Sequence, residues 1–127
     1  MRIRKLLVVA LALLVGGCQT WGPTWSEVSG VRYTRIALDR RPAILVAVGN
    51  EWVGSMTPYK VAPGMYDIVV QSPVHDHFLG SQKTLPLAIA PCRRYYINAQ
   101  FKSPVGPAWT PVVDYVETIP GCRIPAR

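Results

Sequence analysis

Apolar and polar residues alternate over several short stretches of the chain, and these stretches define its expected elements. The run 65–71 places Tyr66, Ile68 and Val70 two residues apart, and the run 83–90 shows the same alternation. Because residues two apart lie on one face of a β-strand, both runs are predicted to be strands. The same kind of pattern predicts further strands at residues 31–38, 42–48 and 95–101.

Short strands separated by turn residues, without a predicted helix, favour an all-β fold. Twelve prolines and ten glycines break the chain into such short segments. We predict a single small antiparallel β-sandwich of six to seven strands. Pro86 indicates that its strand lies at a sheet edge or carries a bulge. The run 43–48 is apolar throughout, so we expect its strand to be central and covered on both faces.

A different pattern occupies the amino terminus, where a basic start precedes an apolar run over 6–15 and two glycines, Gly16 and Gly17. This layout is typical of a secretory signal, and the run is only about half the roughly 20 residues that span a bilayer. With Cys18 directly after the glycines, the segment closely resembles a bacterial lipoprotein signal. The resemblance implies cleavage before Cys18, lipidation of its thiol and, with Gln19 next, an outer-membrane location in a Gram-negative cell. An anchor of three fatty chains would be effectively permanent.

With 127 residues, half of them apolar, the chain is long enough for one domain and too short for two. We expect a signal peptide at 1–17, a lipidated cysteine with a tether at 18–30, and the β-sandwich at 31–127. From Cys18 onward 11 basic and 7 acidic residues remain, a net charge of +4. This modest charge and the expected export make nucleic acid a poor partner. Trp21 and Trp25 in the tether are expected either at the lipid headgroups or packed on the domain.

The two other cysteines, Cys92 and Cys122, suit one disulfide in an oxidising periplasm. The run 95–101 and the turn "SPVGP" predict a hairpin, and folding it about Pro107 makes positions that sum to 214 face each other. Ala99 then faces Tyr115, Phe101 faces Val113, and the two cysteines close the open end. Ile97 opposite Glu117 fits badly, which leaves a bulge or an offset open. Closing this loop would stabilise the domain by roughly 3 kcal/mol.

The order of features from 42 to 101 resembles PEGA-type domains and related carboxypeptidase-regulatory-like β-sandwiches. An apolar strand, "VGSMTP" (53–58) and "VAPGMYDIVV" (61–70) follow one another, with a proline-glycine turn leading into an aromatic, alternating strand. The signature tetrapeptide of the family is absent, and "AVGN" (47–50) stands where an Asp-Gly turn is usual. The resemblance implies an extracytoplasmic binding or structural module and carries over no catalytic residue.

Candidate chemistry is sparse. His75 and His77 would share one face of an extended segment and are candidate metal ligands, but the sequence offers no obvious third or fourth ligand. We therefore expect a polar loop, no metal and no cofactor. No serine lies in a nucleophile-elbow context and no glycine-rich phosphate loop precedes a helix, so the sequence does not predict an enzyme.

Binding residues are easier to identify. The arginine pairs could contact lipid phosphates and the aromatic residues near turns could stack on sugars or on a partner. These candidates are Arg40, Arg41, Trp52, Tyr59, Arg93, Arg94 and Trp109. The alternative is that the arginines solvate strand ends and the tryptophans fill the core.

These observations predict a non-enzymatic lipoprotein, anchored in the outer membrane through Cys18 and facing the periplasm. Its β-sandwich would be a structural module or would bind a protein partner in the envelope. The alternative is a lipoprotein that binds carbohydrate or lipopolysaccharide, and a metal-dependent or hydrolytic enzyme ranks third.

Overall fold

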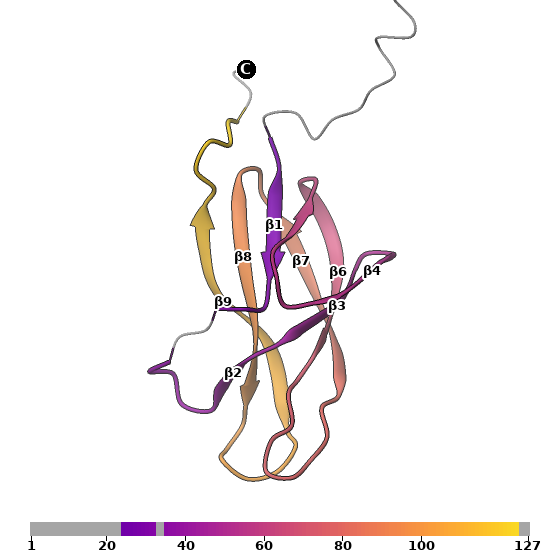
Figure 1. Ribbon diagram of the computed structural model, residues 1–127, viewed down its shortest axis with the longest axis vertical. Coiled ribbons are helices and arrows are strands. Elements are labelled where there is room, and N and C mark those ends of the chain that lie inside the picture. The colour runs from indigo at the N-terminus through magenta and orange to yellow at the C-terminus, as the bar shows by residue number, and fades with distance from the viewer. Residues whose placement is uncertain (1–23, 33–34, 125–127) are drawn as a thin grey trace, which may run out of the picture.

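A computed structural model describes residues 24–32 and 35–124 of the protein (Figure 1). None of these residues is helical, so this part of the chain contains no helix that could cross a membrane. The described residues form nine strands: β1 (Ser26–Ser29), β2 (Arg40–Pro42), β3 (Ile44–Val48), β4 (Glu51–Ser55), β5 (Tyr59–Val61), β6 (Gly64–Gln71), β7 (Gln82–Ile89), β8 (Arg93–Phe101) and β9 (Trp109–Thr118). The predicted all-β sandwich is confirmed, with nine strands where six to seven were expected.

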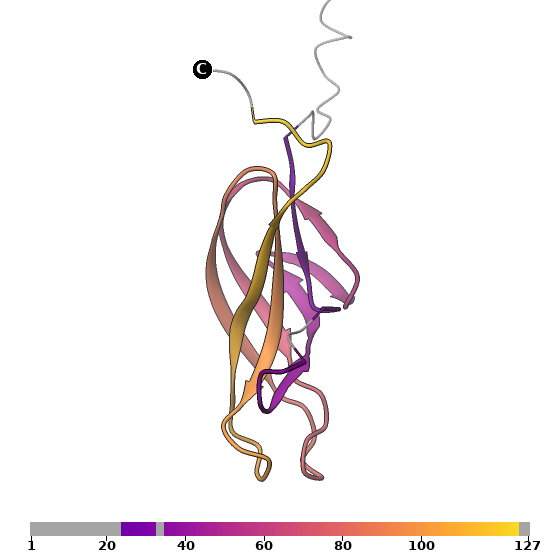
Figure 2. The ribbon, with the colours of Figure 1, turned by 90° about the vertical axis from the view of Figure 1, so that its left-hand side faces the viewer.

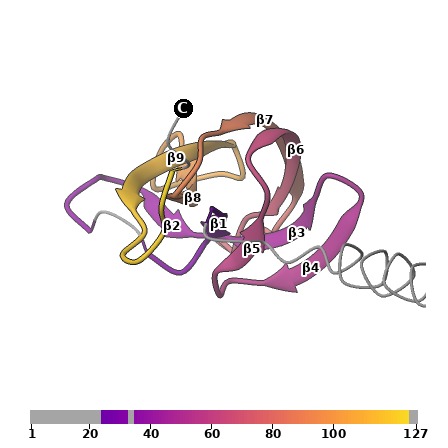
Figure 3. The same ribbon diagram turned by 90° about the horizontal axis from the view of Figure 1, so that it is seen from above.

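The strands form two sheets that enclose one core (Figures 2 and 3). In the five-stranded sheet β8 lies between β9 on one side and both β1 and β2 on the other, and β5 extends the sheet beyond β1. The pairing of β1 with β8 is parallel, whereas the other pairs are antiparallel. The four-stranded sheet has the order β4-β3-β6-β7 and is antiparallel throughout.

The core follows from the alternation of the long strands. Ile68 and Val70 of β6 are fully buried, and Ile97 of β8 faces them from the other sheet's side of the core. Pro86 lies in β7, which is an edge strand as predicted, and proline is tolerated on edge strands because one side of such a strand forms no ladder hydrogen bonds. The strand β3 is central as predicted, but Ile44 is exposed. The expectation that both faces of β3 are covered is therefore wrong, because the second sheet covers only one face.

Two predicted segments differ from the structure. Residues 26–29, expected in the tether, form β1, and the fully buried Ser26 donates its hydroxyl to the carbonyl of Ala90 at 2.6 Å. The sequence of β1 shows no alternation of apolar and polar residues, because small polar residues occupy its buried positions. The predicted strand over 31–38 is wrong, since its described residues form turns and leave Ile36 exposed. The tether can therefore extend no further than residue 25, and residues 1–23 lie outside the described part.

The β8–β9 hairpin forms, but its predicted register is wrong. Phe101 faces Trp109 and Ala99 faces Pro111, because the turn is centred ahead of Pro107. The bulge left open by the sequence lies in this pair: between the partners of Tyr96 and Ile97, β9 carries one extra residue.

Cys92 and Cys122 are nevertheless joined in a disulfide, with a Cα–Cα distance of 5.4 Å. The strand β9 ends at Thr118, and Ile119 still pairs with Cys92 by donating its N–H to that carbonyl at 3.0 Å. The chain then turns back toward Cys92, and the Cys122 N–H donates a hydrogen bond to the Ile119 carbonyl at 3.3 Å. The turn, rather than the strand register, therefore places the second cysteine.

The described ends of the chain lie together at one end of the sandwich, where the Thr24 hydroxyl donates to the Arg123 carbonyl at 2.5 Å. The turns β6–β7 and β8–β9 lie side by side at the opposite end (Figures 1 and 2). We call these two turns, residues 72–81 and 102–108, the tip.

Candidate functional site

The first half of the tip is a narrow extension of the β6–β7 hairpin. Ser72 N–H donates to the Ser81 carbonyl at 3.0 Å, and His75 and Phe78 exchange two backbone hydrogen bonds at 3.0 and 2.9 Å. Asp76 and His77 close the turn with φ angles of 48° and 66°, the left-handed region that Asp and His enter more readily than most side chains. Two left-handed residues match the twist of a tight hairpin. The polar loop predicted from the sequence is therefore a tight turn that extends the hairpin.

The second half of the tip docks onto the first. The His75 ring stacks on Phe101 with the ring centroids 3.8 Å apart, and its Nε2 lies 3.0 Å from the Ser103 carbonyl. A carbonyl only accepts, so Nε2 carries the proton in this contact. The Gly106 N–H donates to Asp76 Oδ2 at 2.8 Å. The two sheets are thus joined at the tip by contacts between side chains and backbone.

Apolar side chains project from this joined tip into solvent. Leu79 is 85% exposed, and Val74, Phe78 and Val105 are also exposed. They come from both turns, which the contacts described above hold side by side. Loops held on a rigid scaffold are frequent binding surfaces, and exposed apolar patches mark interaction sites.

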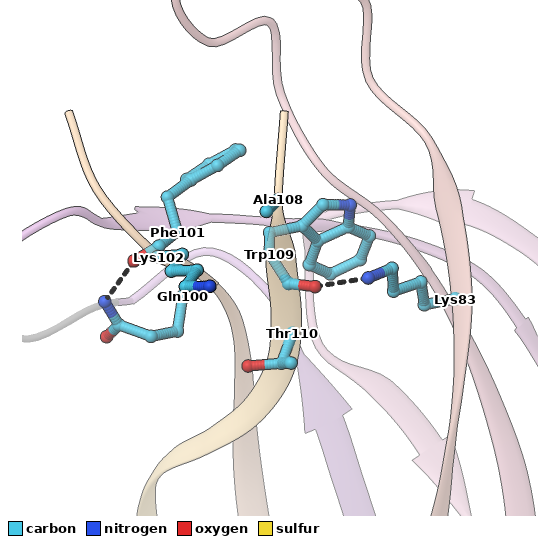
Figure 4. A pocket seen from close by; sticks show the side chains of 7 residues that line it. All are labelled: Lys83, Gln100, Phe101, Lys102, Ala108, Trp109 and Thr110. Carbon is cyan, nitrogen blue, oxygen red and sulfur yellow. Dashed lines mark hydrogen bonds between the residues drawn. The ribbon is translucent and has the colours of Figure 1, made fainter. Parts of the chain in front are cut away.

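A shallow cavity of about 260 Å³ lies beside the tip (Figure 4). Its lining residues are Lys83, Gln100, Phe101, Lys102, Ala108, Trp109 and Thr110. The Lys83 ammonium donates to the Trp109 carbonyl and lies 5.3 Å from the indole centroid. The cavity is below the usual size of a small-molecule pocket, so it suits a single side chain of a partner better than a cofactor.

The structure separates the two histidines that the sequence placed on one face. His75 is held against Phe101 and Ser103, whereas His77 is an exposed residue of the turn itself. The expected extended geometry is wrong, because the left-handed turn reverses the chain between them. Within residues 24–32 and 35–124 no three His, Cys, Asp or Glu side chains come together as metal ligands.

The arginine pairs are engaged within the protein. Arg40 forms an ion pair with Asp114 at 2.6 Å, and Arg93 donates to the Thr118 hydroxyl at 3.1 Å. Arg41 is exposed, and its guanidinium donates to the Arg40 carbonyl at 2.9 Å. The pairs lie at different positions on β2 and β8, and the structure does not bring them together into one basic site.

Arg94 lies in a network on the outer face of the five-stranded sheet. Its guanidinium contacts Glu27 and Glu117, each at 2.6 Å, and the Tyr96 hydroxyl donates to Glu117 at 2.5 Å. The hydrogen bond from Tyr96 and then that from Arg94 lower the pKa of Glu117. Burial and the bond to Glu117 raise the pKa of Tyr96, and the bond to Glu27 raises the pKa of Arg94. The network joins β1, β8 and β9, with Arg32 also 4.6 Å from the Tyr115 ring centroid.

The aromatic candidates divide between core and surface. Trp109 is 3% exposed and donates its indole N–H to the Ser81 hydroxyl at 2.7 Å, so its expected role as an exposed platform is wrong. Tyr59 is half-buried against the core. Trp52 is 77% exposed on β4 and remains available to a ligand. Trp25 packs on the domain with Lys60 4.4 Å from its ring centroid, whereas Trp21 lies outside the described residues.

The apolar residues of the tip were missed by sequence reasoning. The signal was present: "VHDHFLG" was interpreted as a polar loop, although it carries Val74, Phe78 and Leu79 between two strands. Apolar residues in a segment that should be solvated are informative, because burial in the core does not explain them.

No protein-family model, curated protein or solved structure matches the chain. The class that the structure defines is a small disulfide-linked all-β sandwich. Its function has to be argued from its own surface.

Proposed function

We propose that this protein is a non-enzymatic lipoprotein, anchored in the outer membrane through Cys18, whose β-sandwich binds a protein partner in the periplasm. The amino-terminal segment up to Cys18 supports the anchor, because it combines a basic start, an apolar run and small residues before a cysteine. The resemblance of residues 42–101 to PEGA-type envelope modules is part of the same proposal.

The exposed apolar tip is the observation that supports protein binding. The tip, which carries Val74, Phe78, Leu79 and Val105, lies at the end of the sandwich opposite the start of β1, the first described strand (Figure 1). A domain attached at one end presents its other end away from the attachment. The apolar residues there are therefore accessible to a partner in the surrounding compartment.

Rigidity of the tip favours a specific contact. The His75 stack and the Asp76–Gly106 hydrogen bond hold the two turns together before a partner arrives. Binding then loses less conformational entropy than it would with two independent loops. Leu79 and Phe78 supply the apolar anchors, and the adjacent cavity can accept a side chain from the partner.

A photo-cross-linking amino acid placed at Leu79 in the full chain, expressed in Gram-negative cells, tests this proposal. Met65 provides the control, because it is 72% exposed compared with 85% for Leu79 and lies near the start of β6, whereas the tip follows the end of that strand. We expect a discrete adduct, dependent on ultraviolet light, at Leu79 and not at Met65. The same adducts at both positions, or none at Leu79, would contradict a binding role for the tip.

A further inference from the structure

Trp52 is an exposed tryptophan in a fixed position. It lies on β4, the edge strand of the four-stranded sheet, and 77% of the residue is accessible. Trp109 by contrast is in the core. A large apolar ring that is exposed to water lacks the favourable free energy that burial would provide. Packing in the domain core therefore does not explain the position of Trp52.

Gly54 holds the ring against the strand. A Cβ atom at Gly54 would lie 2.4 Å from both Cζ2 and Cη2 of Trp52 and 3.0 Å from Cε2. The six-membered part of the indole therefore rests directly on the glycine backbone, which only a residue without a side chain permits. Gly54 also has a φ of 62°, in the left-handed region. With one face on the strand, the large exposed area belongs to the opposite face.

The outward face of the sheet beside Trp52 carries small side chains. Ile68 and Val70 of β6 point into the core, so the residues that alternate with them point outward. The strand register sets one outward row across the four strands: Trp52, Ala47, Val69 and Thr84. Small side chains next to the indole leave room for a ring to lie on it.

The polar groups of this face are neutral or acidic. Asp67, Gln71 and Gln82 also point outward, whereas β3, β4 and β6 contain no Lys or Arg. Lys83 of β7 is turned toward Trp109. Such a face lacks the cations that bind a phosphate, but its amides and carboxylate can accept hydrogen bonds from hydroxyl groups.

We propose that Trp52 and the outward face of the four-stranded sheet bind an uncharged glycan chain. A pyranose ring presents a face of C–H groups, which packs on an aromatic ring, and an edge of hydroxyl groups, which need polar partners. Trp52 supplies the stacking face. Asp67, two residues before Val69 on β6, supplies a charged acceptor on the same side of the sheet. Trp52 lies on β4, away from the two turns that form the tip, so stacking on its ring does not depend on the proposed protein partner (Figure 1).

Two β-1,4-linked tetrasaccharides, one of N-acetylglucosamine and one of glucose, serve as probes for amino-sugar and neutral-hexose chains. We expect at least one to shift the backbone resonances of Ala47, Trp52, Gly54 and Val69 with a dissociation constant of about 1 mM or lower. Trp52→Ala should weaken this binding at least about tenfold and Trp52→Phe less, because the phenyl ring keeps a smaller stacking face. Leu79→Ala should bind like the wild type.

Two further results distinguish specific stacking on Trp52 from nonspecific adsorption of the sugar to the protein surface. Gly54→Ala keeps the indole but places a Cβ within 2.4 Å of it, so the displaced ring should also bind more weakly. The proposal is overturned if neither tetrasaccharide shifts these resonances at about 10 mM, or if Trp52→Ala binds as tightly as the wild type. Binding of a protein at Trp52 without any sugar effect would equally refute it.

Discussion

Replacement of Arg40 tests whether this arginine stabilises the fold or is available to bind a ligand. The Arg40 guanidinium lies 2.6 Å from Asp114 Oδ1 and its Nε donates to Gln100 at 2.9 Å. Asp114 is the extra residue of the β9 bulge, and its side chain is 1% exposed compared with 22% for Arg40. A carboxylate so deeply buried depends on its positive partner. Arg40 thereby joins β2 to β9 across β8.

The structure sets the size of the effect. Arg40→Met keeps most of the aliphatic stem and removes the charge and both hydrogen bonds. Loss of one member of a fully buried ion pair costs about 3 to 5 kcal/mol. Because the Arg40 side chain is 22% exposed, water can replace part of its role. We therefore expect the free energy of unfolding to fall by about 2 to 3 kcal/mol, in the range of hydrogen bonds to charged groups.

Urea denaturation measures this effect, and Arg41→Met is the matched control. With an m-value of about 1.5 kcal/mol/M, the midpoint for Arg40→Met should fall by about 1.5 M. Arg41 is exposed and bonds only locally to the preceding carbonyl, so its substitution should change stability by about 0.5 kcal/mol or less. Asp114→Asn should recover part of the loss in the Arg40→Met background, because it removes the buried negative charge that Arg40 faces in the wild type. Equal midpoints for the two methionine variants would refute the reasoning.

Three other perturbations follow from the structure and the sequence. The free energy of unfolding of the double variant Cys92→Ala/Cys122→Ala should fall by about 2 to 5 kcal/mol. Mass spectrometry of the non-reduced wild-type protein should find one disulfide-linked peptide that contains both cysteines. Two free thiols would contradict the pairing. The lowered pKa of Glu117 contributes stability that is present above its ordinary pKa and is lost as the pH falls through the folded-state value. Tyr96→Phe removes the main cause of that lowering, so carbon NMR should report a higher Glu117 pKa and the loss of stability on acidification should shrink; an unchanged pKa would exclude the hydrogen bond as its cause. Cys18→Ala should abolish labelling with a fatty acid and cleavage of the signal, and a labelled mutant would show that another residue carries the lipid.

The strands with clear alternation were predictable from the sequence. In β6 and β8 the inward residues are apolar and the outward ones mostly polar, so the local pattern and the tertiary structure agree. The strand β1 was not predictable in this way, because Ser26 and Ser29 occupy buried positions through hydroxyl hydrogen bonds to distant carbonyls. The run 31–38 has strand-like residues but no strand partner in its described part. Pairing partners are a tertiary property that a local pattern does not contain.

The candidate sites were predictable only in part, for the same reason. Trp52 and Trp109 both lie near turns in the sequence, yet one is 77% and the other 3% exposed. What distinguishes them is the neighbour: Gly54 gives the Trp52 ring a surface outside the core, whereas Ser81 accepts the Trp109 indole N–H from the other sheet. The tip likewise depends on two turns that are about 30 residues apart in the chain and meet only when the sheets pack.

The two proposed surfaces can be separated by experiment because they use different parts of the sandwich. The tip is formed by the turns β6–β7 and β8–β9, whereas Trp52 lies on β4, which pairs only with β3. Leu79 and Trp52 are both strongly exposed, so replacing either removes a surface without opening a cavity in the core. A loss of cross-linking confined to tip variants and a loss of sugar binding confined to Trp52 variants would therefore assign the two activities independently. Loss of both from one substitution would instead point to a change in the fold, which the unfolding midpoint would reveal.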